Sequence, residues 1–96
     1  MIPTIPTFQQ YASELKAQGY DEVIERDWAP DTVVDTHEHD FTAKALVVRG
    51  EMWLTKGQHT EHIPAGGTFE LNARQPHSER YGKNGATYWV ARRKSP

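Results

Sequence analysis

Short runs of apolar and β-branched residues alternate with turn-forming residues from Asp21 almost to the end of the chain. The runs are rich in Val, Ile, Thr, Trp and Tyr, whereas Gly, Pro, Asn and Asp recur between them, as in strands joined by tight turns. Many short strands without a second helical stretch are typical of a β-sandwich or a β-barrel. The pattern predicts strands at about residues 22–28, 32–39, 43–49, 51–56, 59–63, 67–71, 77–82 and 86–93.

The first twenty residues carry the one convincing helical pattern. Thr7 is followed three residues later by Gln10, which is the spacing of a capping box at a helix N-terminus. Gly19 is suited to the position just after a helix end. We predict a helix over about residues 7–18, lying on the outside of the main fold. Its apolar stripe consists of Phe8, Tyr11, Ala12 and Leu15.

The length of 96 residues is enough for one domain with one hydrophobic core. We expect a single domain over residues 1–96, in which residues 1–20 form a helical extension and residues 21–94 form the barrel. The chain has no cysteine, which excludes disulfides, thiolate metal sites and cysteine nucleophiles. A domain this small is often stabilised by a metal or by oligomerisation. Its many aromatic residues favour a homodimer.

The charge balance argues against two classes of partner. The 11 basic and 13 acidic residues give a formal net charge of −2, so we expect no nucleic-acid binding. No apolar run approaches the about 20 residues of a membrane span, so we expect no membrane association. The segment Met1–Phe8 lacks the features of a signal peptide. These observations predict a cytoplasmic protein.

The most informative stretch contains His37 and His39. Residues two apart on a strand point to the same face, so both imidazoles can reach one ion at about 2.0–2.1 Å. His77 follows Pro76 much further along the chain, and a neighbouring strand of a closed barrel would bring it opposite the pair. On spacing alone, two exposed histidines on a polar strand remain the more ordinary interpretation.

The surrounding residues resemble the first motif of the cupin family. That motif runs Gly, five residues, His-x-His, three or four residues, Glu, six residues, Gly. His37, His39 and Gly50 match it, whereas Asp31 stands at the first glycine. The motif's glutamate falls at Ala43, which cannot bind a metal.

The second cupin motif runs Gly, five residues, Pro-x-Gly, two residues, His, three residues, Asn. Gly66 and His77 match it, and the run Pro76-His77-Ser78-Glu79 is similar to that of many small single-domain cupins. The resemblance covers about residues 31–93. Three positions depart from the motif, namely Asn72, Arg74 and Tyr81.

The resemblance implies an all-β fold, a cupin-type double-stranded β-helix (jelly-roll) barrel with one short N-terminal helix. It also implies that His37, His39 and His77 bind one divalent transition metal: Zn, Fe, Ni, Cu, Co or Mn. Ala43 then leaves a site of three histidines without a carboxylate. Because neutral ligands do not compensate the charge of the ion, an anionic ligand is favoured at the open position. The expected partner there is therefore a small molecule or an anion.

Four residues are expected in the pocket or around the ligands. Phe41 and Ala43 continue the inward face of the histidine strand and wall the pocket. Glu79 shares a face with His77, where it orients an imidazole, binds the ion or pairs with an arginine. Tyr81 either contacts a bound ligand or packs in the core.

Two classes of function follow from these residues. The first is a mononuclear metalloenzyme, a dioxygenase or isomerase acting on a small organic substrate, with no catalytic residue identified beyond the metal ligands. The second is a non-catalytic cupin module that binds or senses a small ligand or has a structural role. Few acid–base groups are apparent in the pocket, which weighs against hydrolysis and isomerisation.

Overall fold

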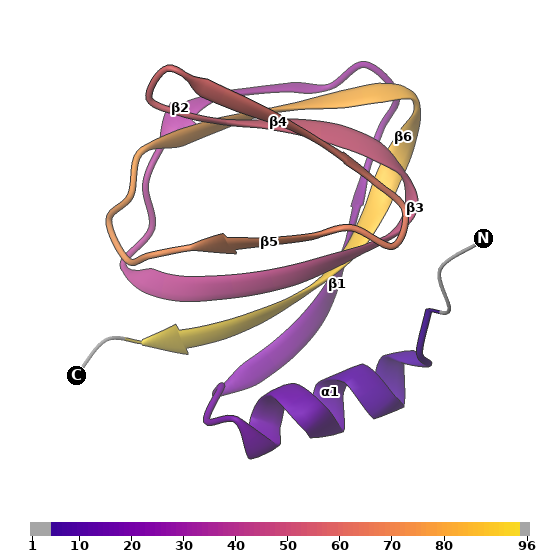
Figure 1. Cartoon of the computed structure of the whole chain (residues 1–96), viewed down its shortest axis with the longest axis vertical. Coiled ribbons are helices and arrows are strands. Elements are labelled where there is room, and N and C mark those ends of the chain that lie inside the picture. The colour runs from indigo at the N-terminus through magenta and orange to yellow at the C-terminus, as the bar shows by residue number, and fades with distance from the viewer. Residues whose placement is uncertain (1–4, 95–96) are drawn as a thin grey trace.

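The computed structural model describes residues 5–94 and shows a barrel of antiparallel strands with one helix on its outside (Figure 1). This architecture confirms the predicted all-β fold with a single N-terminal helix. No helix in the described part of the chain is both long and apolar enough to cross a membrane. The homodimer and the cytoplasmic location stay predictions. The elements are α1 (Phe8–Ala17), β1 (Glu22–Trp28), β2 (Val33–His37), β3 (Phe41–Lys56), β4 (His59–Pro64), β5 (Thr68–Leu71) and β6 (His77–Lys94).

Two long strands, β3 and β6, form the frame of the barrel. β6 pairs with β1, β2 and β3, and β3 also pairs with β4 and β5. Both strands run through positions that we predicted as breaks between shorter strands. The register shifts on either side of Gly50 show the reason: the chain bends there by β-bulges and continues in the ladder.

The glycine-like positions of the two cupin motifs keep a glycine-like backbone. Asp31 and Arg74 stand where the motifs have glycine, and their φ angles are 59° and 62°. Within residues 5–94 they are the non-glycine residues with positive φ. At these two positions the side chain departs from the motif, whereas the backbone keeps a positive φ, which glycine adopts most readily.

Helix α1 begins as its sequence predicts. The Thr7 side chain accepts a hydrogen bond from the Gln10 backbone N–H at 3.1 Å, and the Gln10 side chain accepts one from Thr7 at 2.9 Å. Tyr11 and Leu15 are buried against the outer face of β3 and β6, where they meet Leu46, Trp89 and Ala91. The helix thus covers one outer wall and leaves the interior of the barrel free.

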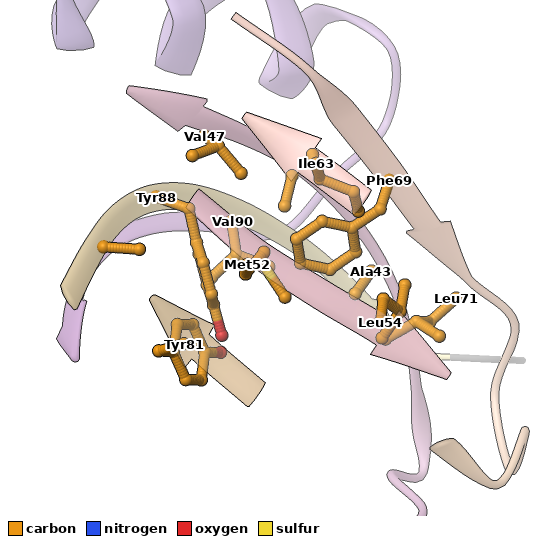
Figure 2. Packing of buried hydrophobic residues seen from close by; sticks show 12 residues of the cluster. Ala43, Val47, Met52, Leu54, Ile63, Phe69, Leu71, Tyr81, Tyr88 and Val90 are labelled. Carbon is orange, nitrogen blue, oxygen red and sulfur yellow. The ribbon is translucent and has the colours of Figure 1, made fainter. Parts of the chain in front are cut away.

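The inner faces of the strands enclose a separate apolar core (Figure 2). Alternate residues of β3 point inward, beginning with Ala43, Ala45 and Val47, as the two-residue period of a strand requires. Tyr88 and Val90 of β6 face them from the paired strand. Any polar side chain inside the barrel therefore lies among apolar neighbours.

Candidate metal centre

The three predicted histidines come together inside the barrel. His37 ends β2 and is the register partner of His77, which begins β6. His39 lies two residues beyond the end of β2, where its carbonyl accepts a hydrogen bond from the Arg74 N–H at 2.6 Å. One ligand atom from each of the three imidazoles lies within 4.8 Å of the others. The turn at Arg74 thus helps to position the second histidine of the His-x-His pair.

Two of the rings are held with a defined nitrogen toward the centre. The Nδ1 atoms of His37 and His77 lie 2.7 and 2.9 Å from the backbone oxygens of Asp35 and Gln75. A carbonyl oxygen only accepts, so each Nδ1 carries a hydrogen, and in the neutral ring each Nε2 then keeps a lone pair. The Nε2 of His77 is buried and has no hydrogen-bond partner among the described residues. A buried lone pair without a partner fits a metal ligand.

The surroundings of His39 favour the neutral form of its imidazole. Burial lowers its pKa from the ordinary value of 6.5, and the neighbouring His37 and His77 lower it further. Its ring also stacks on Phe41, with centroids 4.7 Å apart and planes 16° from parallel. Because a metal binds the neutral imidazole, the lowered pKa favours ligation at neutral pH, whereas the stacking on Phe41 fixes the position of the ring.

Glu79 lies beside two of the candidate ligands. Its Oε2 is 3.6 Å from the Nε2 of His37 and 3.6 Å from the Nε2 of His77, and its side chain is only 6% exposed. Its other carboxylate oxygen accepts a hydrogen bond from the Tyr81 hydroxyl. Glu79 therefore places a negative charge near the centre, from a different strand than the motif glutamate that Ala43 replaces.

Tyr81 lies behind Glu79. It is fully buried, and its ring stacks on Trp28 with centroids 4.9 Å apart. Burial is the main cause that raises the pKa of Tyr81 above its ordinary value of 10, so the hydroxyl remains a proton donor to Glu79. Tyr81 thus contacts a residue of the centre and does not line the cavity.

A cavity of about 150 Å³ opens in front of the three histidines. Ala43 belongs to its wall, together with Leu71 and Phe69, and Glu79 contributes a carboxylate. Phe41 lies outside this wall and lines a neighbouring hollow on the surface. The cavity thus combines three imidazoles and one carboxylate with an apolar floor.

The cavity is also lined by residues of β1 and of the C-terminal half of β6, which the sequence analysis did not connect with the site. These residues are Arg26 and Trp28 of β1 and Tyr88 and Arg92 of β6. Strand parity places Ile24, Arg26 and Trp28 on one face of β1, but it does not say which face of the strand points inward. A charged residue on a short strand is ordinarily exposed, and only the pairing of β1 with β6 turns this one inward.

Solved structures of low sequence identity have the same fold. No family model matches the sequence, and no curated protein matches it. A structure of unknown function from Rhizobium leguminosarum bv. viciae 3841 has a TM-score of 0.75 at 12% identity, covering 96% of this chain and 99% of that one. The cupin domain of Schizosaccharomyces pombe Cnp3 has a TM-score of 0.72 at 10% identity, covering 81% and 55%.

A third similar structure comes from the crystal structures of the DMSP lyases RdDddP and RnDddQII, with a TM-score of 0.71 at 21% identity. That match covers 77% of this chain and 38% of the other, so this chain corresponds to a minor part of that protein. Together with the barrel and the two histidine motifs, these similarities define the fold: the chain has the fold of a small cupin domain.

Proposed function

We propose that the chain is a metal-binding cupin in which His37, His39 and His77 hold one divalent transition metal. The observation that carries this proposal is the buried Nε2 of His77, which has no partner among the described residues and lies in a cluster of three imidazoles. Three imidazole ligands suit Zn, Fe, Ni, Cu, Co or Mn. Glu79, 3.6 Å from two of the nitrogens, compensates part of the charge.

We further propose that the cavity binds a small organic molecule next to the metal and that the reaction is of the oxygenase type. When bound, the ion supplies Lewis acidity and open coordination positions. Ala43, Phe69 and Leu71 give one part of the cavity an apolar surface, which suits the carbon skeleton of such a molecule. The similar DMSP lyase structure supports an enzymatic role on this fold, although a fold alone does not define a reaction.

Metal content tests the first part of the proposal. Protein purified without chelators is expected to hold about one transition-metal ion per chain by elemental analysis. His37→Ala and His77→Ala are expected to lose it, whereas His59→Ala is the control because His59 is exposed on β4. Circular dichroism checks that each variant is folded. Unchanged metal content in both ligand variants would overturn the assignment.

Oxygen consumption tests the second part. The iron-loaded protein is expected to consume oxygen with at least one member of a panel of thiols, diketones and aromatic acids, and His77→Ala is expected to lose this activity. A metal-loaded protein that binds members of the panel without turnover would contradict the oxygenase proposal. That result would favour the non-catalytic cupin module that binds or senses a ligand.

A further inference from the structure

Arg26 projects into the barrel from β1. Its neighbours on the same face, Ile24 and Trp28, pack against the inner apolar core. Arg26 is the register partner of Tyr88, which belongs to that core, and both line the cavity in front of the histidines. The guanidinium lies over the Trp28 ring, 5.1 Å from its centroid. This contact holds the cation at the cavity wall.

Within residues 5–94, Arg26 has no carboxylate partner and no side-chain hydrogen bond. The other arginine of the cavity, Arg92, differs because its Nη1 lies 3.5 Å from a Glu22 carboxylate oxygen. Among the described residues, the Arg26 guanidinium is thus left without an anion.

Arg26 is half-buried, and a cation in a cavity wall with reduced access to water is stabilised when an anion meets it. Arg26 presents a planar fork of donors, which matches a carboxylate in a bidentate arrangement. A divalent ion held by neutral imidazoles would add positive charge on the other side, against the single carboxylate of Glu79. The electrostatics of the cavity therefore select an anionic ligand over a neutral one of the same shape.

We propose that the cavity binds a small organic acid and that Arg26 receives its carboxylate while the rest of the molecule faces the histidines. The proposal rests on the function proposed above and adds the substrate class. The cavity volume of about 150 Å³ limits the size of the acid, since a protein cavity of that volume holds a molecule such as benzene. Arg26 is then the residue that distinguishes acids from their neutral analogues.

Calorimetric titration with matched acids and amides tests this assignment. The probes are acetate, propionate and benzoate, each compared with its amide, on the metal-loaded wild type, Arg26→Gln and Arg80→Gln. Arg80 is the matched control because its guanidinium also lies over a tryptophan, 4.0 Å from the Trp53 ring centroid, at an exposed position. We expect the wild type and Arg80→Gln to bind at least one acid about tenfold more tightly than its amide.

In Arg26→Gln this preference is expected to vanish while the metal content stays the same. If Arg26→Gln does not fold, Arg26→Met carries the same test, because methionine keeps much of the aliphatic stem without the charge. A preference retained in the folded variant, or no binding of any acid to the wild type, would overturn the proposal. Repeating the titration on metal-free protein separates metal binding from acid recognition. A protein that binds no metal contradicts the proposed function, but its preference for acids over amides can still be measured and compared with that of Arg26→Gln.

Discussion

The carboxylate of Glu79 and the imidazole of His77 lie on one face of β6, with Glu79 Oε2 3.6 Å from His77 Nε2 inside the barrel. Glu79 thus supplies a carboxylate near the three histidines, where the motif glutamate is replaced by Ala43. Glu79→Gln keeps the size of the side chain and removes the charge. We expect the affinity for Zn²⁺ to fall about 10- to 100-fold, as for residues that support metal ligands, measured by competition with a chelator.

The matched control for Glu79→Gln is Glu51→Gln. Glu51 also pairs with a histidine, His62, at 2.7 Å, but this pair is at the surface on β3 and β4. Its replacement is expected to leave the Zn²⁺ affinity unchanged. Equal affinities in the wild type and Glu79→Gln would show that Glu79 does not act on the ion.

Tyr81 is predicted to stabilise the buried carboxylate of Glu79. Tyr81→Phe removes the hydroxyl that donates to Glu79 and retains the ring that stacks on Trp28. The buried carboxylate oxygen then lacks its donor, so we expect the free energy of unfolding to fall by about 1–3 kcal/mol in urea denaturation. Tyr20→Phe, at a half-buried position outside the inner core, is the control with little expected change. A Tyr81→Phe protein as stable as the wild type would contradict this role.

Acid is predicted to destabilise the metal-free protein through His39. Burial first, and then His37 and His77, lower the pKa of His39 from 6.5. As the pH falls through 6.5, the unfolded chain therefore takes up a proton that the folded chain does not. This contribution to stability is present above pH 6.5 and is lost as the pH falls from 6.5 toward the lowered pKa. We expect the free energy of unfolding to decrease as the pH falls below about 6.5.

His39→Gln cannot titrate, so its free energy of unfolding should depend less on pH over the same range. His59→Gln, at an exposed position on β4, should keep the dependence of the wild type. Identical pH dependence in His39→Gln and the wild type would rule out His39 as the source.

The histidine cluster could be predicted from sequence because strand parity and the spacing of the two motifs point to the same three residues. Strand parity places His37 and His39 together, and the motif spacing brings in His77. The start of helix α1 could also be predicted, because its capping box is formed by two residues that are close in sequence. The position of Arg26 in the cavity could not be predicted, because its inward orientation depends on the pairing of β1 with β6, which no local pattern contains.

The continuous strands β3 and β6 were missed for a related reason. Glycine residues in a strand pattern indicate either a turn or a bulge, and we predicted breaks at Gly50 and Gly85. In the structure these two glycines meet across the paired strands, and their φ angles are 75° and 70°. Which alternative holds depends on this long-range contact, not on the residues that flank each glycine.

Gly50→Ala is therefore predicted to be strongly destabilising. A Cβ at position 50 would lie 2.0 Å from the Gly85 carbonyl oxygen, in addition to the strain of a positive φ. We expect a loss of at least about 2 kcal/mol in the free energy of unfolding, measured by urea denaturation. Gly57→Ala is the control, because Gly57 has a similar φ of 61° and a Cβ there would meet no atom within 4 Å. It reports the backbone strain alone, so the difference between the two variants measures the close contact between β3 and β6, and equal losses would contradict that contact.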